Sequence, residues 1–298
     1  MRGGGTILCH MRRVLLFCPF LVSTIAVGVV SGAAPRPLVP IAAELEPSRK
    51  VIYKTVGKRE LRLHVFEPKG HRATDKRPVF LAIHGGGWTG GEARKFYPFA
   101  EFFARQGMLG ISLEYRLMNR KAGTTVFDCV RDGSSAVRYL RGHAHELGID
   151  PNRIVVAGGS AGAQVAAGTA LFVKVNDPVD DLKISSVPNA LVLFYPVIDT
   201  SAAGYGQKKI GNRWRELSPV HHVRAGLPPT LIFHGTADTV TPHAGAVQFQ
   251  KNMRAAANPC QLISHPGGPH GYLIFDLKLF DQAMRRTRDF LAWQKMLK

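Results

Sequence analysis

The sequence predicts an α/β protein with one mostly parallel sheet that is covered by helices on both faces. Short apolar runs alternate with longer segments of helical periodicity through most of the 298 residues, which is the order expected when crossover helices join parallel strands. Two of these runs end in glycine-rich segments, at residues 85–87 and 158–162. In such sheets ligands bind beyond the carboxyl ends of the strands. The fold class and the place of a functional site are therefore predicted together.

Residues 1–33 have the pattern of a secretory signal peptide. Three arginines precede a 17-residue apolar run over residues 14–30, and small residues lead to a cleavage site after Ala33. The run is short for a membrane span. We therefore expect cleavage and export to the periplasm or the exterior, with a retained anchor and no cleavage as the alternative. Both Met1 and Met11 fit as the start of translation, since Met11 directly precedes two of the arginines.

Composition fits one globular domain, with 45% hydrophobic and 20% charged residues. The formal net charge is +18, and removing the three leader arginines leaves +15. The basic residues are scattered rather than grouped in runs, so we expect a solvated basic surface and no nucleic-acid partner. Cys129 and Cys260 are the cysteines that follow the leader, and two cysteines are too few to form a disulfide framework. The sequence leaves open whether they pair, and it does not give the oligomeric state.

The first half of the domain reads as a hairpin followed by alternating strands and helices. Residues 34–50 hold four prolines and little pattern and form a lead-in to a domain over 51–298. Alternating apolar and polar residues predict a hairpin, and unbroken apolar runs predict strands buried on both faces. Apolar residues at helical spacing predict the helices. These elements are strands at 51–56, 61–66, 78–83 and 108–115, and helices at 92–106 and 126–147.

The second half continues the alternation around one irregular stretch. Three β-branched residues predict a strand at 154–156, and the small residues after the glycines predict a helix over 161–173. Residues 197–229 contain glycines and no clear period, which indicates a small lid or a wall of the substrate pocket. The remaining elements are strands at 190–195, 230–233 and 260–264, and helices at 243–256 and 275–296.

The segment Gly158-Gly-Ser-Ala-Gly162 has the form of a nucleophile elbow. A strand, a sharp turn and a helix with serine at the bend expose the hydroxyl of Ser160 and require small neighbours. The alternative is a plain glycine-rich loop. The earlier segment His84-Gly-Gly-Gly-Trp88 strengthens the catalytic interpretation, because consecutive glycines after a buried strand leave amides free to face an oxyanion. The lysine and spacing of a phosphate-binding Walker loop are absent from this segment.

A serine nucleophile needs a base and a carboxylate to orient it. Asp238 and His270 each follow a predicted strand in a Gly- or Pro-rich loop, and the order Ser160, Asp238, His270 suits this fold. Asp199 is the next candidate for the acid, and Asp238 has the alternative role of capping the following helix. The competitors of His270 are His265 and His243.

Other residues are expected to support the site or have two possible roles. His84 is expected to stabilise the glycine loop rather than to react. Trp88 either lines the acyl side of the pocket or packs in the core. The pair His221-His222 has no partner at metal spacing and no HExxH motif occurs, so we expect neither a metal nor a cofactor.

The chain resembles the α/β-hydrolase family, in particular its hormone-sensitive-lipase-like branch and the bacterial acetyl- and feruloyl-esterase (BD-FAE-like) group. The resemblance runs from about Tyr53 to Leu291 and is carried by His84-Gly-Gly-Gly-Trp88, Tyr115-Arg116, Gly158-Gly-Ser-Ala-Gly162, His234-Gly-Thr-Ala-Asp238 and Pro269-His270-Gly271. It implies Ser160 as nucleophile, Asp238 as acid and His270 as base. It also implies an oxyanion hole formed by the amides of Gly86, Gly87 and Ala161.

The chain departs from the family pattern at two positions. Ala163 stands where many relatives have glycine, and Glu114 stands where an aspartate is common, which weakens assignment to a narrow subfamily. The expected activity is hydrolysis of short-chain acyl esters, such as carbohydrate acetyl or feruloyl esters, through an acyl-serine. Alternatives are a general lipase or carboxylesterase, an amide hydrolase, and a non-catalytic binding protein on the same fold. The natural ester is left open.

Overall fold

The computed structural model describes residues 1, 3–4 and 36–297. Apart from residues 1, 3 and 4, the predicted signal peptide lies outside the described residues, as does its cleavage site. Residues 36–297 form one compact unit built on an eight-stranded sheet. The strands in chain order are β1 (Arg49–Val56), β2 (Arg59–Phe66), β3 (Arg77–Ile83), β4 (Leu109–Leu113), β5 (Ile149–Gly159), β6 (Ala190–Phe194), β7 (Thr230–Gly235) and β8 (Cys260–His265).

The spatial order of the strands is β1-β2-β4-β3-β5-β6-β7-β8. β2 is antiparallel to both of its neighbours, and the strands from β4 to β8 are parallel to one another. β5 lies in the interior of the sheet between β3 and β6, whereas β8 is an edge strand paired only with β7. The mostly parallel α/β sheet predicted from the sequence is confirmed.

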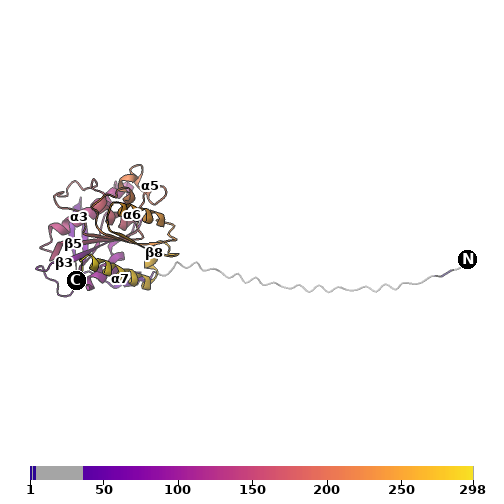
Figure 1. The fold of residues 1–298 in the computed structure, drawn as a ribbon, viewed down its shortest axis with the longest axis horizontal. Coiled ribbons are helices and arrows are strands. Elements are labelled where there is room, and N and C mark those ends of the chain that lie inside the picture. Colours follow the sequence, from indigo (N-terminus) through magenta and orange to yellow (C-terminus); the bar gives the residue numbers. More distant parts are fainter. Residues whose placement is uncertain (2, 5–35, 298) are drawn as a thin grey trace. The chain divides into compact units, whose positions relative to one another are not determined.

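Helices cover both faces of this sheet (Figure 1). One face carries α1 (Leu38–Glu44), α2 (Tyr97–Arg105) and α7 (Leu277–Trp293), and the other carries α3 (Val126–Gly142), α4 (Ala161–Leu171) and α6 (His243–Ala255). Side chains of a strand point alternately to its two faces. Phe80 and Ala82 of β3 accordingly pack with the first set, and Leu81 and Ile83 pack with the second. Continuous apolar strands therefore serve two separate cores.

Several boundaries differ from the sequence-based expectation. The lead-in contains α1, whose Leu38 and Ala42 are four residues apart and buried on one side of the helix. β5 begins at Ile149 rather than at residue 154, because Ile149 pairs with Arg77 before an irregularity in the register. α3 ends at Gly142, five residues earlier than expected. The differences at β5 and α3 lie at the ends of elements, whereas α1 is an additional helix before β1.

The stretch over residues 197–229 contains only short helices. They are α5 (Gln207–Ile210) and the 3-10 helices Trp214–Leu217 and Pro219–His221. Among residues 36–297, Cys129 and Cys260 are buried and form no disulfide. Within the described part of the chain, no helix combines the length and hydropathy needed to cross a membrane.

Candidate active site

Ser160 lies at the sharp turn between β5 and α4. Its backbone angles, φ 54° and ψ −121°, fall in the region that favours glycine, which for another residue costs about 1–3 kcal/mol and needs support from its surroundings. That support comes from the amide of Ser160, which donates to Phe194 O at 2.9 Å, and from Ser160 O, which accepts the amide of Val197 at 3.1 Å. β6 and the residues after it therefore hold the turn from one side.

The glycine two residues after Ser160 is required by close packing. A Cβ atom on Gly162 would lie 2.3 Å from the carbonyl oxygens of both Ile83 and His84, which no side chain tolerates. The first turn of α4 thus packs directly against the end of β3. This contact brings the serine turn beside the glycine loop that follows β3.

His270 lies in hydrogen-bond contact with both Ser160 and Asp238. Its Nε2 is 2.9 Å from Ser160 Oγ, and its Nδ1 is 2.8 Å from Asp238 Oδ2. Ser160 follows β5, Asp238 follows β7, and His270 follows β8, so the three side chains meet at the carboxyl edge of the sheet. The structure therefore brings together the three residues that the sequence singled out as a catalytic set.

The Asp238 carboxylate is buried and fully hydrogen-bonded. Oδ1 accepts the amides of Val240 and Thr241 at 2.9 and 2.8 Å, and Oδ2 accepts the Thr241 hydroxyl at 2.9 Å. His234 Nε2 lies 3.3 Å from Oδ2. Burial alone would raise the pKa of Asp238, but hydrogen bonds from His234, His270 and the Thr241 backbone outweigh it and hold this pKa well below the usual range. The group is ionised at neutral pH.

The competing residues lie elsewhere. Asp199 Oδ1 accepts the amide of Ser201 at 2.8 Å and has no hydrogen bond to His270. His243 Nε2 lies 2.8 Å from the hydroxyl of Ser264, and the His265 ring stacks on Tyr272. None of these three side chains reaches Ser160. Asp238 also accepts the amides of its own turn, but it does not cap the following helix, because α6 begins at His243 with Pro242 as its N-cap and no side-chain cap.

The glycine loop after β3 presents its amides without internal partners. Gly86 has φ 127°, which a side chain rarely adopts, and its carbonyl accepts the amides of Thr89 and Gly90. Within the described residues, the amides of Gly86, Gly87 and Ala161 donate to no protein acceptor. Amides left free beside a serine are the donors that an oxyanion requires.

Trp88 is fully buried, and its Nε1 donates to Gln164 Oε1 at 3.1 Å. Of the two alternatives that the sequence left open, core packing is the one observed. His84 holds the loop as expected, because its Nδ1 lies 2.8 Å from Gly85 O and its ring stacks on Tyr115. Among residues 36–297 no three His, Cys, Asp or Glu side chains are grouped to hold a metal ion.

Several residues that support the site were not identified from the sequence. Thr241 donates twice to Asp238, and its Oγ1 lies 3.2 Å from His270 Nδ1. The spacing Asp-x-x-Thr is a signal for such a turn. The Tyr195 ring packs edge-on against His270 at 5.3 Å between centroids, and Tyr195 has φ 38°. Its backbone strain and contacts depend on tertiary packing and leave no mark in the sequence.

His84 makes the stability of the fold depend on pH. Burial lowers the pKa of His84 to about 4 from its usual 6.5, so the unfolded chain binds a proton more readily than the folded chain between these values. The free energy of unfolding should therefore fall by up to about 3 kcal/mol as the pH drops from 6.5 to 4, and this contribution stays constant below pH 4. Urea unfolding across this range measures it. The variant His84→Gln should show a shallower dependence, and an equal slope in both proteins would contradict the prediction.

The fold and the site together define a serine hydrolase of the α/β-hydrolase class, since a strand-turn-helix serine, a later aspartate and a final histidine meet on a mostly parallel sheet. The family model for BD-FAE matches residues 63–253. The chain belongs to this family.

Several proteins that the chain resembles are esterases by name. The chain is 36% identical to the apo form of Thermogutta terrifontis esterase 2, with a TM-score of 0.80 and coverage of 84% of this chain and 96% of that one. It is 29% identical to the carboxylesterase NlhH of Mycobacterium tuberculosis, over 92% of this chain and 91% of NlhH. It is also 27% identical to the probable carboxylic ester hydrolase LipM of the same organism, over 68% of this chain. The chain spans about half the length of LipM.

Proposed function

We propose that this protein is an exported serine carboxylic-ester hydrolase that acts on short-chain acyl esters, such as carbohydrate acetyl or feruloyl esters. The observation that carries the proposal is the position of His270, within hydrogen-bond distance of both Ser160 Oγ and Asp238 Oδ2. That contact is the minimum needed to make a serine hydroxyl nucleophilic. No cofactor enters the proposed reaction.

In the proposed reaction Ser160 Oγ attacks the ester carbonyl while His270 Nε2 takes its proton. The ionised Asp238 holds the imidazole by Nδ1 and stabilises its positive charge. The amides of Gly86, Gly87 and Ala161 donate to the oxyanion of the tetrahedral intermediate. The C–O bond to the alcohol then breaks and the alcohol leaves with the proton of His270. Water repeats the sequence on the acyl-serine and releases the acid and the free enzyme.

A preference for short acyl groups has two supports. The stretch over residues 197–229 forms short helices rather than a long apolar cap. Thermogutta terrifontis esterase 2, a relative of similar fold, has been solved with propionate and with butyrate bound. Export is supported by the leader pattern alone, and sequencing the amino terminus of the exported chain, expected to begin at Ala34, tests it.

A panel of esters tests the function. The wild type should hydrolyse nitrophenyl acetate and butyrate with higher kcat/KM than long-chain nitrophenyl esters, because the short helices over residues 197–229 form no long apolar cap to cover a long acyl chain. Acetylated xylan and feruloyl esters in the same panel identify the class of alcohol or acid. A preference for long chains would indicate a lipase, and turnover of anilides at a similar rate would indicate an amide hydrolase.

A binding protein on a hydrolase fold is the alternative of another class. It predicts that a serine-reactive fluorophosphonate labels neither the wild type nor Ser160→Ala. Labelling of the wild type alone supports catalysis. The related esterase 2 has been solved phosphoramylated by tabun, so organophosphorus probes suit this group of proteins.

A further inference from the structure

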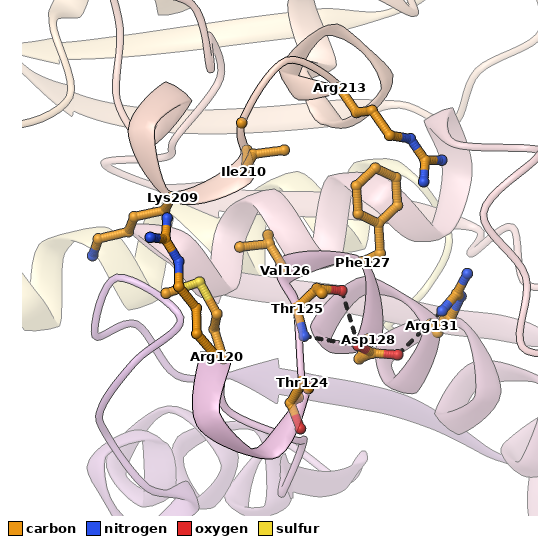
Figure 2. Close-up of a pocket in the computed structure, with 13 residues that line it drawn as sticks. Arg120, Thr124, Thr125, Val126, Phe127, Asp128, Arg131, Lys209, Ile210 and Arg213 are labelled. Carbon is orange, nitrogen blue, oxygen red and sulfur yellow. Dashed lines mark hydrogen bonds and ion pairs between the residues drawn. The ribbon is translucent and has the colours of Figure 1, made fainter.

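A pocket of about 600 Å³ lies between the start of α3 and the segment that contains α5 (Figure 2). The amide of Met118, which lines the pocket, donates to Trp88 O at 2.7 Å. Lys209, which also lines it, donates from Nζ to Gly87 O at 3.0 Å. Two residues that line the pocket, Met118 and Lys209, therefore contact the loop that supplies the proposed oxyanion hole.

The pocket carries an excess of positive charge. Four cationic side chains and a single carboxylate, that of Asp128, line it; the cations are Arg120, Arg131, Lys209 and Arg213. Arg131 is paired with Asp128 and Arg213 with Glu216. Unlike charges that face each other need no ligand, so these two pairs alone would not indicate a binding site.

Arg120 and Lys209 differ from the paired arginines because only neutral groups contact them. Arg120 donates to Lys208 O at 2.8 Å, and Lys209 donates to Gly87 O and to the Tyr205 hydroxyl. Neither has a carboxylate partner among residues 36–297. Two adjacent uncompensated cations repel each other, and an anion placed between them would remove that cost.

Apolar side chains separate the two groups of cations. Figure 2 shows Lys209 and Arg120 on one side of the pocket, Arg213 and Arg131 on the other, and Val126 and Ile210 between them. The guanidinium of Arg213 lies 4.3 Å from the centroid of the Phe127 ring, which holds it in place by a cation–π contact. A pocket of this form suits a small ring that bears an acidic group better than an extended polyanion, which needs a continuous basic track.

We propose that this pocket binds the carboxylate or sulfate group of an acidic saccharide whose acyl ester is placed at Ser160. The inference rests on the proposed esterase function and names its substrate class. The acidic group lies between Arg120 and Lys209, the two cations whose printed contacts are to neutral groups, and the ester reaches the glycine loop past Lys209. Arg120 then selects among substrates and takes no part in bond breaking.

Three matched substrates test the proposal. They are monoacetylated methyl glucoside, the corresponding methyl glucuronoside and the corresponding primary sulfate ester of the glucoside, which share a ring and an acetyl group and differ in charge. The wild type should release acetate from at least one charged sugar with kcat/KM about 10-fold above that for the neutral sugar, since a hydrogen bond to a charged group contributes about that much. Added salt should reduce this advantage. A higher value for the carboxylate or for the sulfate identifies the acidic group.

Variants of Arg120 and Arg213 locate the effect. Arg120→Gln should lower the ratio of kcat/KM for the charged sugar to that for the neutral sugar by about 10-fold. Arg213→Gln removes a cation that is paired with Glu216 on the other side of the pocket and should leave the ratio unchanged. Arg285→Gln, on the exposed side of α7, removes the same charge away from the pocket and should leave the ratio unchanged. Lys209 is left intact because it also holds Gly87.

The outcomes separate the two proposals. If the wild type hydrolyses the neutral and charged sugars equally well, the pocket inference is wrong and the esterase function stands. If all three sugars and nitrophenyl acetate are inert, the function itself is wrong. An equal loss in Arg285→Gln would assign the preference to the overall charge of the protein and would overturn the role of the pocket.

Discussion

Replacing Ser160 by alanine is expected to lower kcat for nitrophenyl acetate by about 10⁴- to 10⁶-fold, the range seen when the nucleophile of a catalytic triad is removed. The change deletes the hydroxyl that lies 2.9 Å from His270 Nε2 and leaves the turn, the glycine loop and Asp238 in place. Initial rates on purified wild type and variant measure the effect. Thermal unfolding should give similar midpoints, because alanine suits the backbone at Ser160 no worse than serine does.

A double-mutant comparison tests whether Ser160 and His270 act together in catalysis. If Ser160 and His270 act as one unit, the variant with both changed to alanine should be no slower than Ser160→Ala alone, since effects within a triad are not additive. Additive losses would mean that the two side chains act independently. Residual turnover within about 10-fold of the wild type in Ser160→Ala would refute the role of the serine.

The change Asp238→Asn is expected to lower kcat by about 10⁴-fold. Both carboxylate oxygens only accept hydrogen bonds here, from two amides, the Thr241 hydroxyl and His270. The side chain of asparagine must turn its NH₂ group toward one of these donors. Either the hydrogen bond that fixes the tautomer of His270 is then lost, or the hydrogen bonds from the amides of Val240 and Thr241 are lost. The charge that stabilises the imidazolium is lost as well. Steady-state kinetics with nitrophenyl acetate at neutral pH measure the decrease.

Asp199→Asn is the matched control for this change. Asp199 lies on the loop after β6 and accepts hydrogen bonds from the amide of Ser201 and the hydroxyl of Ser218, and none from His270. The same substitution there should therefore reduce kcat by less than about 10-fold, because it alters only hydrogen bonds that do not involve the catalytic residues. The opposite result, with a large loss at Asp199 and a small one at Asp238, would reassign the acid.

The parts of this site that the sequence predicts are those whose chemistry is local. A strand followed by Gly-x-Ser-x-Gly leaves few alternatives, since Gly162 must approach the end of β3 and Ser160 must occupy a strained turn. The sheet could be predicted because continuous apolar runs suit strands with a core on each face. Both features depend on residues that are adjacent in the chain.

The parts that the sequence does not predict depend on contacts between distant segments. The contact of Lys209 with Gly87 joins residues 122 positions apart, and no local pattern marks either partner. The contact of Tyr195 with His270 is of the same kind. α1 was missed because its two buried residues are too few to establish a helical period. Thr241 alone had a local signal, its spacing from Asp238.

Because β8 lies at the edge of the sheet, the segment that carries His270 should open locally more readily than the segment that carries Ser160. Ser160 follows β5, whose backbone is hydrogen-bonded on both sides, while the loop of His270 follows β8, which is paired only with β7. Amide hydrogen exchange should therefore be slower in β5 than in β8, because an edge strand can open without unfolding the centre of the sheet. On warming, His270 would separate from Ser160 before the whole fold is lost. Catalytic activity would therefore be lost at a lower temperature than that of global unfolding.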